Sequence, residues 1–133
     1  MDYLLDTCIV SAILKKNENV LEKVALVEFA REKIFFSTIT YYETKRGLLA
    51  NKATRKMEKF DEIRQDYDML GIDSEAVLDE ASEIYANLKQ RGKLLPDADI
   101  FIAAIALIYH LTLITDDSHF DRIKGLNIEN WLR

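Results

Sequence analysis

Residues 96–117, PDADIFIAAIALIYHLTLITDD, decide the fold of this chain. Positions 100–109 are almost entirely apolar, which predicts a helix that is covered on several sides. Leu113-Ile114 stands between two threonines and is typical of a short buried strand in a parallel sheet. This strand delivers Asp116-Asp117 at its C-terminal end, the edge at which open α/β sheets form their sites. Two further aspartates stand where the helix begins, so two separate acidic groups can reach the same place.

Length and composition favour one domain with a single core, over residues 1–133, because the 133-residue chain is 49% hydrophobic. Cys8 is the only cysteine, so no intrachain disulfide can form, and a reducing cytoplasm fits this composition. The start of the chain has no secretory signal pattern. The apolar run that begins at Ile100 is shorter than the roughly 20 residues that span a bilayer. We therefore expect a cytoplasmic protein that does not enter a membrane.

Charge is unevenly distributed along the chain. The net charge of −5 argues against a nucleic-acid-binding protein of the usual basic kind. Residues 45–64, however, contain seven Lys or Arg against three acids, whereas residues 66–83 contain seven acids and no Lys or Arg. A locally basic surface on an acidic protein is one interpretation of this pattern, and a solvated helix face is the other.

Short apolar runs alternate with helical patterns along the chain. Strands are predicted at 3–5, 34–36, 67–72 and 113–114, with a final edge strand at 127–128. Further helices are predicted at about 7–15, at 20–29, from Thr40, on both sides of Asn51, and from Ser74 to Arg91. This alternation predicts an α/β fold in which helices flank a central, mostly parallel sheet of four to five strands.

Acidic residues recur where strands end or where the next helices begin. Asp6 follows the first strand, Glu43 lies one turn into the helix after the second, and Asp99 and Asp117 flank the last buried helix and strand. Carboxylate oxygens suit hard cations such as Mg²⁺ and Mn²⁺, and zinc is poorly supported because the chain has no Cys/His cluster. Such an ion can position a phosphoryl group and lower the pKa of a bound water.

Each of these acids also has a structural interpretation. Asp6 can cap the helix that follows it. Thr40-x-x-Glu43 matches a capping box, in which the glutamate binds a backbone N–H. Asp97 is the favoured cap of the buried helix, with Asp99 in its first turn, and Asp116-Asp117 is ordinary turn material. One carboxylate alone is therefore weak evidence, and the shared position of all of them in the predicted fold is the stronger signal.

Several short segments together resemble one known family. They are Leu4-Leu5-Asp6-Thr7, Ser37-Thr38-Ile39-Thr40-x-x-Glu43, Asp99-x-x-Ile102-Ala103-Ala104, and Leu113-Ile114-Thr115-Asp116-Asp117 followed by Phe120. The joint pattern resembles PIN-domain nucleases, most of all the small VapC-type toxins of prokaryotic toxin–antitoxin pairs. The resemblance extends from Tyr3 to Trp131. It implies a PIN-like three-layer fold around a parallel sheet.

The same resemblance implies which residues act. Asp6, Glu43, Asp99 and Asp117 are the implied catalytic and metal-binding acids, and Asp116 is the alternative fourth ligand. The family further implies Mg²⁺ or Mn²⁺ dependence, endonucleolytic cleavage of RNA, a homodimer, and inhibition by a cognate antitoxin. The main alternative is a PIN-like module that binds RNA or a protein partner without cleaving.

Other side chains are assigned supporting roles. Thr7 and Thr115 are expected to support the carboxylates by donating hydrogen bonds. Contacts to an RNA backbone are expected from basic residues, with Arg46 the first choice, followed by Lys45, Lys52 and Arg55. Cys8 is expected to be a buried structural cysteine rather than a nucleophile. His119 lies close enough in sequence to the predicted site to contact phosphate, although a surface role is the more common one.

Overall fold

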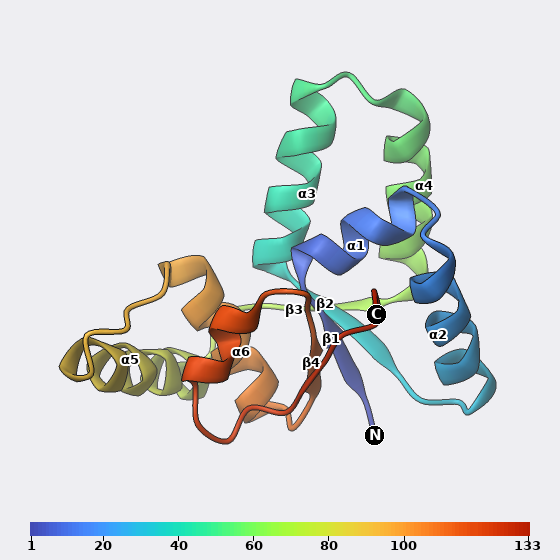
Figure 1. Ribbon diagram of the computed structural model, residues 1–133. Helices are drawn as coiled ribbons and strands as arrows, with labels where there is room; N and C mark the ends of the chain where they lie inside the picture. The colour runs from blue at the N-terminus through green and yellow to red at the C-terminus, as the bar shows by residue number, and fades with distance from the viewer.

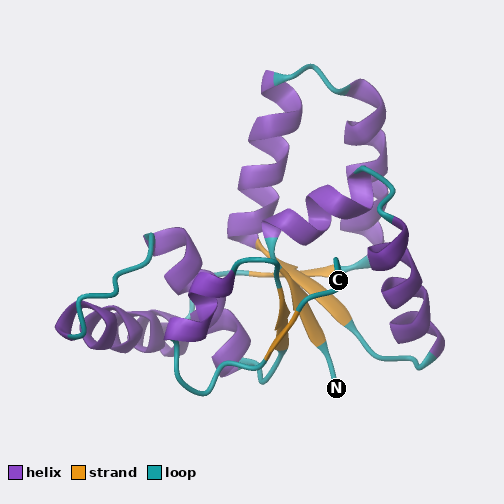
Figure 2. Ribbon diagram, in the orientation of Figure 1, coloured by secondary structure: helices purple, strands orange, loops and turns teal.

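A five-stranded parallel sheet forms the centre of the computed structural model, which describes residues 1–133 (Figures 1 and 2). Its order is β3-β2-β1-β4-β5, and every neighbouring pair is parallel. The strands are β1 (Tyr3–Leu5), β2 (Ile34–Ser37), β3 (Asp68–Leu70), β4 (Thr112–Ile114) and β5 (Ile128–Glu129). The predicted α/β class and the four to five strands are confirmed, and the sheet is wholly parallel.

Helices fill the connections between the strands. In chain order they are α1 (Thr7–Leu14), α2 (Glu18–Phe29), α3 (Thr38–Ala50), α4 (Thr54–Asp66), α5 (Glu75–Gln90), α6 (Asp97–Ile108) and the short 3₁₀ helix η1 (Ser118–Arg122). No helix combines the length and the apolar character that a membrane crossing requires.

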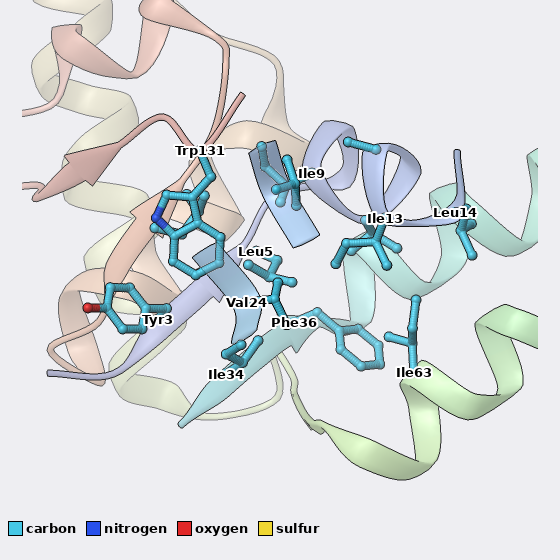
Figure 3. Close-up of a cluster of buried hydrophobic side chains, with 14 of the residues drawn as sticks. Tyr3, Leu5, Ile9, Ile13, Leu14, Val24, Ile34, Phe36, Ile63 and Trp131 are labelled. Carbon is cyan, nitrogen blue, oxygen red and sulfur yellow. The ribbon is translucent and has the colours of Figure 1, made fainter. Parts of the chain in front are cut away.

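Helices cover both faces of the sheet, and because side chains alternate along each strand, successive strand residues contribute to the cores on opposite faces. Leu4 of β1 belongs to a core with α5 and α6, whereas Tyr3 and Leu5 belong to a second core with α1, α2 and α4. Figure 3 shows this second core, in which the Trp131 indole lies 5.3 Å from the Tyr3 ring centroid. The result is the three-layer arrangement that the resemblance implied.

Helices α3 and α4 form a hairpin that projects from the sheet (Figure 1). Most of the basic segment 45–64 lies on this hairpin. Its few apolar residues hold it to the rest of the molecule, since the buried ring of Phe60 packs against Phe36 and Tyr41 with centroids 6.3 and 5.4 Å apart. The basic side chains are therefore left largely on a projecting surface.

Two helix starts differ from the sequence-based expectations. Pro96 occupies the cap position of α6, and no side chain caps this helix, so the prediction of Asp97 as the cap is wrong. Ser37 caps α3, and its hydroxyl accepts from the Thr40 backbone N–H at 3.0 Å. The capping box at Thr40 and Glu43 is therefore also wrong, because the helix starts three residues earlier and Glu43 is free for another role.

Candidate active site

The C-terminal ends of β1 and β4 define the position of the site. The chain runs from β1 outward through β2 and β3 and then returns to the other side of β1 as β4. Side chains at such a point of reversal face a crevice beyond the strand ends. Asp6 follows β1 and Thr115 follows β4, and the Thr115 hydroxyl donates a hydrogen bond of 2.7 Å to Asp6 Oδ2.

Asp6 is a buried carboxylate, only 8% exposed, that caps α1. Its Oδ1 accepts from the Thr7 backbone N–H at 2.8 Å. Burial raises the pKa of Asp6, the nearby Glu43 adds to the rise, and the hydrogen bonds from Thr115, Thr7 and Cys8 oppose it. Capping and membership of an acidic cluster are thus compatible roles for this residue.

Glu43 is held beside Asp6 by a side chain rather than by its own backbone. The Thr7 hydroxyl donates to Glu43 Oε1 at 2.7 Å and also lies 3.1 Å from the Thr40 hydroxyl. Because Thr7 begins α1 and Thr40 lies in the first turn of α3, these bonds join the starts of two helices that follow different strands.

The two consecutive aspartates after β4 have different surroundings. The Asp117 backbone N–H donates to the Thr115 hydroxyl at 3.1 Å, and its carboxylate pairs with His119 Nδ1 at 3.3 Å. The Asp116 carboxylate instead accepts from Asn130 at 2.7 Å and pairs with Arg133 at 3.4 Å. The C-terminal tail thus engages Asp116, and Asp117 is the residue that the hydrogen bonds connect to Asp6.

Asp99 lies in the first turn of α6, and the charges of the other three acids act on its pKa. Burial raises its pKa to about 6, the charges of Asp6, Asp117 and Glu43 contribute to the rise in that order, and His119 lowers it. Asp6, Asp117 and Glu43 are therefore all within electrostatic reach of Asp99. Residues 6, 43, 99 and 117 form what we call the acidic cluster.

Helix starts surround the acidic cluster. Helices α1, α3 and α6 all begin at the C-terminal edge of the sheet, where their unpaired N–H groups and partial positive charges point. These dipoles partly offset the repulsion between carboxylates. The fold can therefore hold several carboxylates close together although their negative charges repel.

The donor set of the acidic cluster fits a hard divalent cation. All of its ligating atoms are carboxylate oxygens, with threonine hydroxyls holding Asp6 and Glu43 in place. No three His, Cys, Asp or Glu side chains are already grouped as direct ligands of one ion. Magnesium needs only one or two carboxylates and keeps several waters, so the arrangement suits an ion that is held partly through water.

Cys8 lies at the edge of the acidic cluster and is only partly buried, rather than buried as predicted. Its Sγ is 3.7 Å from Asp6 Oδ2 and 3.9 Å from the Thr115 hydroxyl. Burial raises the pKa of this thiol, and the Asp6 charge adds to the rise. A thiol that is kept protonated in this way is a poor nucleophile, as expected.

The four predicted basic residues are not gathered at the acidic cluster. The Arg46 guanidinium lies 5.1 Å from the ring centroid of Tyr42, which is 61% exposed. Lys45 turns toward Tyr41, whose hydroxyl accepts from its Nζ at 3.0 Å. Lys52 and Arg55 lie at the far end of the hairpin, so only Arg46 remains a candidate contact close to Glu43.

One feature beside Glu43 was not predicted from the sequence. A groove of about 190 Å³ opens between α1, α3 and the start of α4. We call it the α1–α3 groove and define it by the lining residues Ser11, Lys15, Glu43, Thr44, Gly47 and Lys56. They come from three helices and form no local motif, so the sequence holds only the weak signal of a helix face with small and polar residues.

Comparisons with known proteins identify the family of this chain. The PIN domain profile matches residues 3–126. This chain belongs to the PIN-domain family. This PIN domain is 33% identical over 127 residues to ribonuclease VapC1 of Methanocaldococcus jannaschii, and the match covers 95% of this chain and 84% of the relative. The predicted resemblance to VapC-type proteins is confirmed.

Solved structures of related PIN domains come from toxin–antitoxin complexes. VapBC2 of Rickettsia felis, bound to a DNA fragment from its promoter, contains a chain with a TM-score of 0.90 and 26% identity, covering 98% of this PIN domain and 99% of that chain. DNA-bound VapBC of Salmonella typhimurium gives a TM-score of 0.85 at 26% identity, with 98% of both chains covered. The similarity extends over nearly the whole of both chains, including the sheet edge that holds the acidic cluster.

Proposed function

We propose that this PIN domain, a single domain over residues 1–133, is a divalent-metal-dependent endoribonuclease and the toxin of a toxin–antitoxin pair. The observation that supports catalysis most directly is the acidic cluster itself. Three carboxylates from separate parts of the chain act on the pKa of a fourth, Asp99, at the edge where α/β sheets form sites. The relatives named ribonuclease VapC support RNA as the substrate.

The proposed reaction is hydrolysis of a phosphodiester bond, assisted by a divalent ion that carboxylate oxygens would hold. Bound Mg²⁺ or Mn²⁺ supplies charge neutralisation at the phosphodiester and lowers the pKa of a water. Asp6, Asp99 and Asp117 would hold the ion, partly through bound water, and Glu43 would contribute directly or through water. Thr115 and Thr7 keep Asp6 and Glu43 oriented by donating hydrogen bonds of 2.7 Å each. Without these hydroxyls the carboxylates would be free to turn away from one another.

RNA and protein partners follow from the surface and the relatives. Arg46, stacked over the exposed Tyr42 ring beside Glu43, is the first proposed contact to the RNA backbone. Its neighbour Lys45 would add a second contact, and Lys52 and Arg55 would meet phosphates further along the hairpin. The VapBC complexes support a cognate antitoxin as the inhibitor. A homodimer in the cytoplasm completes the proposal.

The test is cleavage of labelled RNA by the purified protein with Mg²⁺ or Mn²⁺, before and after EDTA. We expect metal-dependent fragments, and we expect Asp99→Asn to abolish them while the protein stays folded. Asp97→Asn is the matched control, because it removes the same charge from the same helical turn at an exposed position outside the acidic cluster. An Asp99→Asn protein with full activity would refute the assignment.

The alternative, a PIN-like module that binds without cleaving, predicts a different outcome of the same experiment. Such a protein would retain RNA without producing fragments at any metal concentration. The presence of all four carboxylates favours catalysis, since a binding module does not need repelling charges whose burial raises their pKa.

A further inference from the structure

The α1–α3 groove lies directly against the acidic cluster, because Glu43 and Thr7 line both. The groove has a volume of about 190 Å³ and is open to solvent. Only two of its ten lining residues are hydrophobic, so its walls offer hydroxyls and charges rather than an apolar slot. A ligand in this groove would therefore be polar and close to Glu43.

Two lysines from different helices stand at this groove. Lys15 follows α1 and Lys56 lies in the first turn of α4, and both are exposed. They meet at one place on a protein whose net charge is −5. Positive charge that lies next to an acidic cluster suits a polyanion that must reach the carboxylates, and phosphate is the anionic group of RNA.

Thr44 provides an independent observation. Its side chain is only 6% exposed, and its hydroxyl is the one buried side-chain polar atom without a hydrogen-bond partner. A threonine in a helix can donate to the carbonyl four residues earlier, but this hydroxyl makes no such bond. A buried hydroxyl without a partner costs stability, and threonine in a helix has two accessible χ1 rotamers that re-aim it. In the present rotamer the hydroxyl oxygen is enclosed, and rotation about χ1 would let it reach a polar ligand in the groove.

Gly47 keeps the groove open. It lies one turn after Glu43 on α3, and a Cβ built on it meets no atom within 4 Å. Glycine inside a helix costs stability relative to alanine, and neither a positive φ nor a close contact requires it here. The folded backbone would accept a larger residue here, and the glycine leaves this part of the groove unfilled.

We propose that the α1–α3 groove binds the ribonucleotide next to the cleaved phosphodiester bond, with Lys15 and Lys56 at its phosphate and Thr44 hydrogen-bonded to its base or ribose. This inference rests on the proposed function and adds a specificity subsite to it. Occupation of the groove places the neighbouring phosphodiester at Glu43 and the rest of the acidic cluster. The two lysines and Thr44 position the substrate and take no part in bond cleavage.

Gly47→Leu tests the proposal by filling the groove. Since a Cβ at this position meets no atom within 4 Å and leucine favours a helix over glycine, the variant is expected to melt at the same or a higher temperature than the parent. KM for RNA should rise about tenfold, a loss in the range of the contacts of one base, while kcat changes less. Ala50→Leu is the matched control, because it adds a leucine at an exposed position of the same helix that does not line the groove.

Thr44→Val tests the hydroxyl separately. Valine keeps the shape and removes the buried group without a partner, so the melting temperature should stay the same or rise. RNA affinity should fall about threefold to tenfold, the value of one hydrogen bond. A purely structural role of Thr44 predicts the opposite result, a lower melting temperature with unchanged RNA affinity.

Binding is measured separately from cleavage, with a labelled single-stranded RNA pool and Asp99→Asn protein that carries each groove variant. If the wild-type protein cleaves no RNA, the proposed nuclease function is refuted. The binding assay would still show whether the groove binds RNA. Equal KM, RNA affinity and cut positions for Gly47→Leu and Ala50→Leu would overturn the subsite. A Gly47→Leu protein that loses only antitoxin binding would also overturn it, since the groove would then serve a protein partner.

Discussion

Replacement of Asp99 by asparagine should stabilise the metal-free protein at neutral pH. The pKa of Asp99 rises from 3.8 to about 6, first because the carboxyl is buried and then because Asp6, Asp117 and Glu43 are close. A difference of about two pKa units corresponds to about 3 kcal/mol. Because the side chain is only partly buried, solvent screening reduces this figure to about 1–3 kcal/mol. The asparagine side chain would keep the shape of the carboxylate without its charge.

The stabilisation should depend on pH with a defined sign. A carboxyl whose pKa is raised on folding binds its proton more tightly in the folded state, so ionisation opposes folding. The penalty is absent below about pH 4, grows as the pH rises from 3.8 to about 6, and is fully present above pH 6. The free energy of unfolding of Asp99→Asn should therefore equal that of the parent at low pH and exceed it at neutral pH.

Urea and thermal unfolding in EDTA, at about pH 4 and at about pH 7.5, measure this difference. At the higher pH an expected gain of about 2 kcal/mol corresponds to about 5–10 °C in melting temperature for a domain of this size. Asp97→Asn, exposed on the same turn, should show no comparable gain. A gain of the same size at both pH values, or none at either, would show that Asp99 does not share its surroundings with the other three carboxylates. Added Mn²⁺ should favour the parent over Asp99→Asn.

Three further predictions follow from the surroundings of single residues. Asp117→Asn should lower the rate of RNA cleavage by at least about 100-fold through the loss of an anionic ligand, whereas Asp116→Asn should leave this rate nearly unchanged. Equal losses of rate in the two variants would refute the choice of Asp117 over Asp116. Thr115→Val should weaken Mn²⁺ binding by about 10–100-fold, measured by calorimetry, because Asp6 loses its 2.7 Å hydrogen bond. Trp131→Ala should lower the free energy of unfolding in urea by about 3–5 kcal/mol, because a 2% exposed ring against Tyr3 is removed, and a loss below about 1 kcal/mol would contradict that packing.

Local patterns were sufficient to predict the architecture. The three central strands are apolar runs, whereas β3 begins with Asp68 and β5 ends with Glu129, and most helices show a start signal or an apolar stripe. The alternation of the two specifies a parallel sheet because parallel strands need crossover connections. The positions of Asp6, Asp99 and the pair Asp116-Asp117 at the ends or starts of elements were predictable for the same reason.

Side-chain direction, by contrast, was decided only by tertiary structure. The sequence permits Glu43 to close a capping box, and the cap at Ser37 together with the Thr7 hydroxyl turns it to the acidic cluster instead. It also left open the choice between Asp116 and Asp117, for which the tail residues Asn130 and Arg133 favour Asp117 by engaging Asp116.

By itself, the sequence determined which elements form and which of their ends carry acids, because propensity, periodicity and capping act over a few neighbouring residues. Only the tertiary structure decided which carboxylates come within electrostatic reach of Asp99 and where a polar groove opens beside Glu43. Those outcomes depend on contacts between segments up to 109 positions apart, such as Asp6 and Thr115, and no local pattern encodes such a contact.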